Sequence, residues 1–144
     1  MSGSMGKRDI LDLLDLTLLD LDASQEDLAE VCDLASEHRT AAVCVFPKHA
    51  GFVKRRIDPV VSLALVAGGF PRGSESPDEI FDAVSEAASK GADEIDCVLE
   101  PCDGISFPGE GELAKLIAMR EASQGLILKV IVESPLLDER RLRA

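Results

Sequence analysis

Aromatic residues are scarce in this sequence, and their scarcity narrows what the chain can do. Aromatics make up 3% of the 144 residues, with no tryptophan and no tyrosine. Nucleic-acid modules that stack bases on aromatic rings are therefore disfavoured. The formal net charge of −12 points the same way, because a phosphate backbone would be repelled overall. We expect no nucleic-acid partner.

Long apolar runs are also missing. No run approaches the ~20 residues that a membrane-spanning helix needs, so we expect no membrane partner. The N-terminal residues are small and polar and lack the apolar segment of a signal peptide, so residues 1–9 are interpreted as a leader or a disordered segment. Hydrophobic residues make up 46% of the chain, enough for one domain, which we place at residues 10–144.

The cysteines show no close pairing. There are four of them, Cys32, Cys44, Cys97 and Cys102, and no Cys-x-x-Cys pair occurs. A zinc site that combines Cys97 and Cys102 with His38 or His49 is therefore not expected. Isolated cysteines of this kind are typical of reduced thiols, which indicates a cytoplasmic protein.

Apolar strand patterns alternate with helical patterns along the whole chain. The predicted strands cover residues 14–19, 40–46, 60–67, 94–99 and 126–132. Ser24 and the run Ser76-Pro77-Asp78-Glu79 are N-terminal helix signals, and a third, short helix is expected over 49–56. Such alternation predicts a parallel sheet. Both a doubly wound sheet and part of a (β/α)₈ barrel fit this pattern.

Helical spacing also predicts which side chains are buried. For the helix after Ser76, the predicted core face is Ile80, Phe81, Val84, Ala87 and Ala88, with Gly91 ending the helix in a left-handed turn. A loop rich in glycine and proline is expected over 101–111. The next helix is predicted to pack through Leu113, Leu116, Ile117 and the stem of Arg120. A last helix is expected to begin at Leu137.

Two charged residues interrupt the apolar runs. Lys129 lies within 126–132 and Asp96 within 94–99, in segments typical of strands buried on both faces. An unpaired charge there would be costly, so each group needs a partner or a function. A core ion pair is one interpretation; a lysine and a carboxylate from neighbouring strands also suggest carbonyl chemistry. Strand alternation puts Asp15 with Thr17, and Glu94 with Asp96, on shared faces that a barrel would bring together.

Five motifs, in order and at matching spacing, resemble the deoxyribose-phosphate aldolases. They are Leu14–Leu19, Thr40–Pro47, Gly69–Gly73, Gly91–Asp96 and Leu128–Glu133. The resemblance implies a (β/α)₈ barrel, here an incomplete one of about five βα units with parallel strands. It also implies a class I aldolase, a lyase without metal or cofactor. Such enzymes reversibly cleave 2-deoxyribose 5-phosphate to acetaldehyde and glyceraldehyde 3-phosphate through a lysine Schiff base.

The resemblance also implies roles for particular residues. Asp96 matches the aspartate of the proton relay, and Lys129 matches a supporting lysine beside it. Asp15, Thr17 and Cys44 match positions on the substrate side. Lys129 acting as the Schiff-base amine is an alternative that the family pattern disfavours, since in the family that amine lies on the sixth strand.

No sixth strand is predicted for this chain, so we expect it to be inactive alone. The alternative is a non-catalytic binding or self-assembling protein on the same scaffold, because five strands leave two sheet edges open. A homo-oligomer is therefore expected. A flavodoxin-like protein is a third interpretation, which the lack of a phosphate-binding loop disfavours.

Overall fold

The computed structural model describes residues 6–100, 108–133, 135 and 137–143. Its centre is a five-stranded, all-parallel sheet in the order β1-β2-β3-β4-β5. The strands are β1 (Asp15–Leu18), β2 (Ala42–Val45), β3 (Ser62–Ala67), β4 (Glu94–Val98) and β5 (Ile127–Ile131). The predicted strands are thus confirmed, each one to three residues shorter than the sequence pattern indicated.

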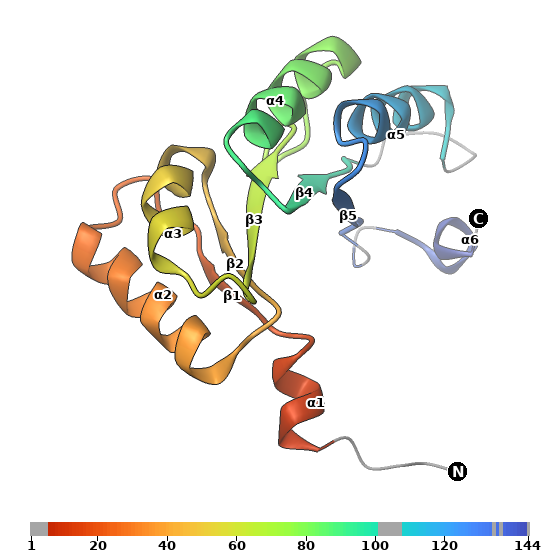
Figure 1. Cartoon of the computed structure of the whole chain (residues 1–144). Helices are drawn as coiled ribbons and strands as arrows, with labels where there is room; N and C mark the ends of the chain where they lie inside the picture. Colours follow the sequence, from red (N-terminus) through yellow and green to blue (C-terminus); the bar gives the residue numbers. More distant parts are fainter. Residues whose placement is uncertain (1–5, 101–107, 134, 136, 144) are drawn as a thin grey trace.

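Helices separate the strands along the chain. They are α1 (Lys7–Leu11), α2 (Gln25–His38), the 3₁₀ turn η1 (Pro47–His49), α3 (Ala50–Arg56), α4 (Pro77–Ser89), α5 (Glu110–Ala122) and α6 (Glu139–Leu142). The sheet curves, and helices α2 to α5 cover its outer side (Figure 1). Among the described residues, none of these helices is long and apolar enough to cross a membrane.

The strand order decides between the two predicted architectures. Each strand pairs with the strand that precedes it in sequence, so the order never reverses. A doubly wound or flavodoxin-like sheet contains a reversal, whereas a (β/α)₈ barrel has this continuous order. The fold is therefore that of an incomplete barrel, with β1 and β5 at the two edges of an open sheet.

Local sequence signals explain where helices α2 and α4 begin. Ser24 caps α2 by accepting a hydrogen bond from the Asp27 amide at 3.1 Å, and Ser76 caps α4 through the Glu79 amide. Both caps are reciprocal, because the third helical residue returns a carboxylate to the serine amide. Gly91 follows α4 with a φ of +88°, the left-handed conformation that glycine adopts without strain.

The two sides of the sheet have different cores. On the outer side, alternate strand residues pack against the helices, and Leu63, Leu65 and Ile95 are fully buried there. On the inner side the buried residues are smaller: Ala42, Cys44, Ala64 and Val66. Strand alternation places these two sets on opposite faces, so helix packing and the inner face use different residues.

Several predicted core positions are wrong. Phe81 is 40% exposed, because Ile80, Val84 and Ala87 form the buried stripe of α4 and Phe81 lies about 100° away around the helix. On α5 the predicted Leu113 and Ile117 are exposed, and the buried residues are Glu112, Ala118 and Met119.

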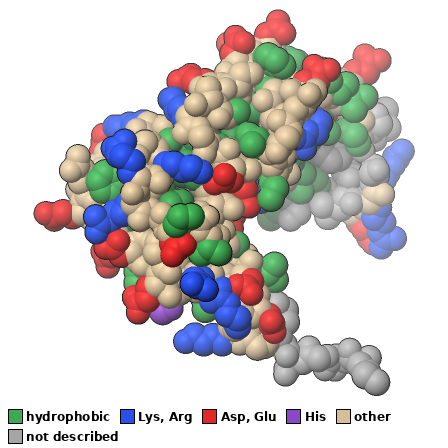
Figure 2. Space-filling model, viewed as in Figure 1, with side chains coloured by type: hydrophobic (Ala, Val, Ile, Leu, Met, Phe, Trp, Pro, Cys, Tyr) green, Lys and Arg blue, Asp and Glu red, His purple; other side chains and the backbone are tan. Residues whose placement is uncertain are grey.

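The cause of the α5 error is that the helix carries apolar residues on more than one side, and the side with Ala118 and Met119 is the one buried in the outer core. Hydrophobic side chains are accordingly visible at the surface over α4 and α5, while basic side chains gather over α3 (Figure 2).

Other boundaries also differ from the sequence prediction. Strand β5 was expected to be buried on both faces, but it is an edge strand whose two end residues are exposed. The predicted loop over 101–111 lies partly outside the described residues, and Gly111 belongs to α5. Helix α1 begins at Lys7, inside the predicted leader, so the division of the chain at residue 10 stays a prediction.

Candidate active site

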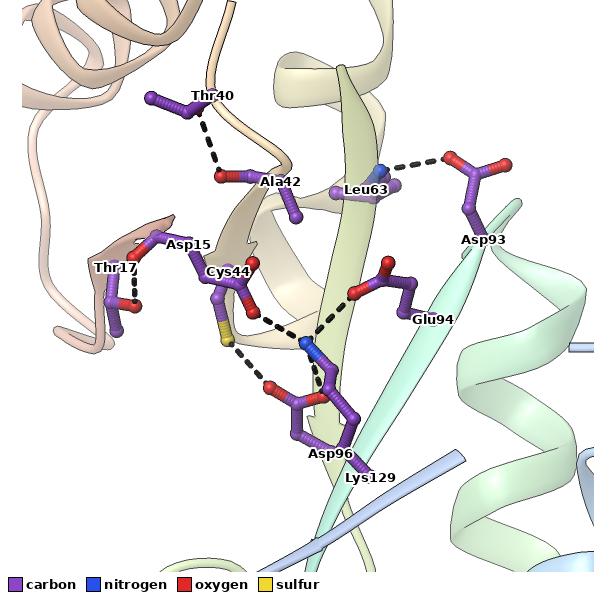
Figure 3. A network of polar contacts seen from close by, with 10 residues as sticks. All are labelled: Asp15, Thr17, Thr40, Ala42, Cys44, Leu63, Asp93, Glu94, Asp96 and Lys129. Atoms are coloured by element: carbon purple, nitrogen blue, oxygen red, sulfur yellow. Dashed lines mark hydrogen bonds and ion pairs between the residues drawn. The ribbon is translucent and has the colours of Figure 1, made fainter. Parts of the chain in front are cut away.

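The inner face of the sheet holds a cluster of charged residues around one lysine. Lys129 reaches inward from β5, and its Nζ lies 2.5 Å from Asp15 Oδ2, 2.7 Å from Glu94 Oε2 and 3.1 Å from Asp96 Oδ1 (Figure 3). Small neighbours make this possible, since Ala42 and Ala64 leave space on the intervening strands. The predicted meeting of Lys129 and Asp96 in one interior space is therefore confirmed.

This cluster connects the two edges of the sheet. Asp15 begins β1 and Lys129 lies in β5, 114 residues further along the chain, yet their side chains form a hydrogen bond. Strands at opposite ends of a flat five-stranded sheet would be about 19 Å apart. The contact is possible because the sheet curls, as a barrel sheet does.

The electrostatics of the cluster favour a charged lysine. Burial alone would lower the pKa of Lys129, but the close contacts with Asp15 and Glu94 and the negative charge of Asp96 outweigh it, so the pKa lies above its ordinary value. Three carboxylates face one ammonium, and the lysine side chain is 35% exposed. Lys129 is consequently a cation at neutral pH and not a free amine.

Asp96 lies between the lysine and a thiol. The Cys44 thiol donates to Asp96 Oδ2 over 3.5 Å. The other oxygen, Oδ1, is buried, and its 3.1 Å contact with Lys129 is an ion pair without hydrogen-bond geometry; among the described residues it has no hydrogen-bond donor. A thiol is a weak donor, so Asp96 has one weakly satisfied oxygen and one oxygen that is ion-paired with Lys129 but not hydrogen-bonded.

The environment of Cys44 keeps it protonated. Burial, followed by the nearby charge of Asp96, raises the pKa of the Cys44 thiol to about 12. A thiol of this kind is a poor nucleophile. Burial likewise raises the pKa of Cys97 to about 12 and that of Cys32 to about 11. Cys102 lies outside the described residues.

Thr17 stands apart from the ion pairs. It is in register with Cys44 on the neighbouring strand, but its side chain is exposed and its hydroxyl donates to the backbone oxygen of Asp15 at 3.2 Å. The structure therefore brings Asp15, Cys44, Asp96 and Lys129 together, and places Thr17 beside them without joining it to the cluster.

Glu94 is the member of the cluster that the sequence reasoning did not name as a site residue. It begins β4, its side chain is 12% exposed, and it contacts Lys129 more closely than Asp96 does. The signal was present in the strand pattern, because Glu94 and Asp96 are two residues apart and share a face. In the described part of the chain, no group of three or more histidine, cysteine, aspartate or glutamate side chains is arranged to hold a metal ion.

The arrangement suits proton transfer. It contains a fixed cation, a carboxylate with one oxygen that has no hydrogen bond, and a thiol held neutral, all on the inner face of a curved parallel sheet. A carboxylate of this kind can give and take protons beside a reacting carbonyl group. The cluster contains no neutral amine among the described residues, so it does not by itself supply a nucleophile for Schiff-base formation.

Comparisons with known proteins show that the chain is similar to one group of enzymes. No protein-family model matches the chain. Deoxyribose-phosphate aldolase from Corynebacterium jeikeium is 41% identical over 138 residues, which cover 91% of this chain and 55% of that protein. The enzyme of the same name from Finegoldia magna is 33% identical over 132 residues, covering 91% of this chain and 62% of that protein.

Solved structures agree. A protein from Coccidioides immitis assigned as a deoxyribose-phosphate aldolase superposes with a TM-score of 0.82 at 27% identity, covering 94% of this chain and 53% of that one. The deoxyribose-phosphate aldolase from Aeropyrum pernix, described as a tetramer, superposes with a TM-score of 0.73 at 25% identity, covering 94% and 57%. The chain thus spans between about half and two thirds of the length of the relatives it matches.

Proposed function

This chain is a homologue of the N-terminal part of the deoxyribose-phosphate aldolases, and from that premise we propose that it serves the aldol reaction of this family. The reaction is the reversible cleavage of 2-deoxyribose 5-phosphate to acetaldehyde and glyceraldehyde 3-phosphate, a carbon–carbon lyase reaction. One observation carries the proposal: Asp15, Cys44, Asp96 and Lys129 come from four different strands and meet on one inner face.

Asp96 is the proposed proton-transfer residue. Schiff-base formation removes a hydroxyl group as water, and the later enamine takes up a proton; both steps need a group that exchanges protons. Asp96 Oδ1 is buried beside the Lys129 ammonium and has no hydrogen-bond donor among the described residues, so its hydrogen-bonding capacity is unused there. Asp15, Thr17 and Cys44 lie around it and are proposed to face the sugar phosphate.

Lys129 is proposed as a supporting cation and not as the reacting amine. A Schiff-base lysine must be neutral to attack an aldehyde, and the raised pKa of Lys129 opposes this. The reacting amine would then come from outside the cluster, and the chain alone would not form the covalent intermediate. The setting proposed for this activity is deoxyribonucleotide breakdown in the cytoplasm.

A hybrid protein tests the proposal. The full chain is joined to the C-terminal segment of the Corynebacterium jeikeium relative that the chain does not match, and cleavage of 2-deoxyribose 5-phosphate is followed by acetaldehyde release. We expect cleavage by the hybrid and its loss on Asp96→Asn. Glu86→Gln on the outer surface of α4 is the matched control and should leave the rate unchanged. A folded hybrid whose cleavage rate is the same before and after Asp96→Asn would contradict the role of Asp96.

Borohydride trapping tests the role of Lys129. The chain is treated with acetaldehyde and borohydride, and peptides are mapped by mass spectrometry. We expect no adduct on Lys129 at neutral pH, because its ammonium is held by three carboxylates. An adduct at Lys129 formed faster than at the exposed Lys48 would make it the reacting amine and overturn the assignment.

A second candidate function, self-association, has its own support. Strand β5 is an open edge, and Ile127, Ile131 and Val132 on and after it are 55%, 40% and 41% exposed. Open strands bearing apolar side chains pair readily with another chain. We expect a concentration-dependent oligomer by sedimentation velocity, weakened by Ile131→Lys. Val60→Lys, at an apolar residue that is 60% exposed and lies outside the sheet, is the control. A monomer at all concentrations would exclude this second function.

A further inference from the structure

The Lys129 ammonium lies closer to the carboxylates at the amino ends of the strands than to Asp96. Asp15 is the first residue of β1, and Glu94 is the first residue of β4. Asp96 lies two residues further along β4, about 6.6 Å closer to the carboxyl ends. The carboxyl ends of barrel strands are where substrates bind. Lys129 makes its two shorter contacts to the carboxylates at the amino ends, at 2.5 and 2.7 Å, and its longest to Asp96.

Of these two anchoring carboxylates, Glu94 is the less exposed. Its side chain is 12% exposed, whereas that of Asp15 is 29% exposed. Water therefore competes less with the contact between Glu94 and Lys129 than with the contact between Asp15 and Lys129. Strands β2 and β3 offer the Lys129 ammonium no further carboxylate on this face among the described residues. Strand β2 contributes the neutral thiol of Cys44, and β3 contributes the apolar Ala64 and Val66.

We propose that Glu94 is a positioning residue, which holds the Lys129 ammonium toward the amino ends of the strands and so limits its contact with Asp96 Oδ1 to an ion pair at 3.1 Å, leaving that oxygen without a hydrogen bond and able to exchange protons. This inference rests on the proposed aldolase function for its chemical meaning. Without Glu94, the ammonium would lose one of its two close partners and move onto Asp96. A hydrogen bond from Lys129 would then form at the oxygen that has only an ion-pair contact now.

The chain itself provides the first test, with no catalysis needed. Acetic anhydride at about pH 9 acylates neutral amines, and mass spectrometry gives the rate for each lysine in the folded protein. In the unsubstituted chain we expect Lys129 to react at least about tenfold more slowly than the exposed Lys48. A Lys129 that reacts as fast as Lys48 would show that it is not held, and the inference would fail even if no variant could be folded.

The variant Glu94→Gln gives the second test, because glutamine keeps the size of the side chain and removes its charge. We expect acylation of Lys129 to become about tenfold faster, since one charge-assisted contact is lost. Glu86→Gln is the matched control: Glu86 pairs with Lys90 at 2.9 Å on the surface of α4, and its loss should change the Lys129 rate less than about twofold. A merely structural role for Glu94 would lower stability without changing the reactivity of Lys129 in the folded chain, so an unchanged rate overturns the inference.

The hybrid enzyme separates this inference from the proposed function. There we expect Glu94→Gln to lower kcat about tenfold with little change in KM, because the substrate contacts remain and proton exchange by Asp96 is impaired. An active hybrid whose kcat is unaffected by Glu94→Gln overturns the role of Glu94 and leaves the aldolase function standing. If Asp96→Asn leaves the cleavage rate of the hybrid unchanged, the proposed aldolase function is contradicted. Faster acylation of Lys129 in the Glu94→Gln chain would still support the anchoring of the lysine by Glu94.

Discussion

The two faces of the sheet show how one set of strands serves two purposes. The outer face carries large apolar residues such as Leu63, Leu65 and Ile95, which are fully buried under helices. The inner face carries small residues such as Ala42 and Ala64, and over them an ammonium and its carboxylates. Strand alternation assigns each residue to one face, so neighbouring positions in sequence belong to different environments.

This difference separates stability from chemistry. Apolar burial on the outer face stabilises the folded state, and this contribution does not depend on the protonation of nearby groups. The inner face holds charges that must stay paired, so removing one partner acts through charge and depends on pH. Substitutions on the outer face should therefore change the free energy of unfolding at every pH, and substitutions on the inner face should change reactivity and the pH dependence of stability.

The largest expected effect on the inner face comes from Asp96→Asn. In the hybrid enzyme, turnover should fall by about 100-fold or more, because proton transfer by a positioned group contributes about that much. The free energy of unfolding should change by less than about 1 kcal/mol, since the change relieves some repulsion among three carboxylates. Turnover and urea unfolding measured on the same preparation check this. A large loss of stability together with full turnover would break the comparison of the two faces.

On the outer face, Leu63→Ala should show the opposite behaviour. Leu63 is fully buried, so truncation should cost about 2–5 kcal/mol in the free energy of unfolding. Urea denaturation measures it, with Val60→Ala as control at a residue that is 60% exposed, where a change within about 0.5 kcal/mol is expected. Acylation of Lys129 in the folded variant should stay as in the parent chain. A cost below about 1 kcal/mol would mean that this face is not close-packed.

Replacing Lys129 by methionine should show how much its charge contributes to the free energy of unfolding, because that contribution depends on pH. The raised folded pKa of Lys129 stabilises the chain fully below the ordinary lysine pKa of about 10.4, and this contribution is lost as pH rises through the folded pKa. Lys129→Met should therefore be less stable by about 1–3 kcal/mol near neutral pH, a discounted figure because the side chain is 35% exposed.

The difference between Lys129→Met and the parent should shrink above about pH 10.4. Urea unfolding between about pH 7 and about pH 12 gives both curves, and subtraction removes the shared titration of the cysteines. A difference that stayed constant over this range would mean that Lys129 acts by packing and not by charge.

The smallest expected effect is at the cap of α4. Ser76→Ala removes the acceptor for the Glu79 amide and should cost about 1 kcal/mol in the free energy of unfolding. Ser74→Ala, at an exposed serine outside the helix, is the control and should be nearly neutral. Equal effects of the two substitutions would remove the cap as an explanation for where the helix begins.

Much of this architecture could be predicted because its signals are local. The caps at Ser24 and Ser76 and the left-handed Gly91 are short-range patterns that act within one turn of chain. The convergence of Asp96 with Lys129 followed from strand alternation together with the order of five family-like motifs. These predictions depend on residues that lie close in sequence, or on a known order of strands.

The remaining features depend on which surfaces pack together. Helix α5 has apolar residues on more than one side, and burial of the side with Ala118 and Met119 leaves Leu113 and Ile117 exposed, which periodicity alone does not show. Glu94 begins a strand, a position where a glutamate is ordinarily solvated, and it is buried because Lys129 arrives from a strand more than thirty residues later. Such partners become visible in three dimensions.

The continuous strand order also has a consequence for how the chain folds. Each strand and its helix add beside the preceding unit, so nearly all sheet contacts join neighbours in sequence and can form stepwise from the N-terminus. The hydrogen bond between Asp15 and Lys129 is different, because it closes a loop of 114 residues. We expect it to form last, so protection of Lys129 from acylation during refolding would mark the moment at which the sheet completes its curl.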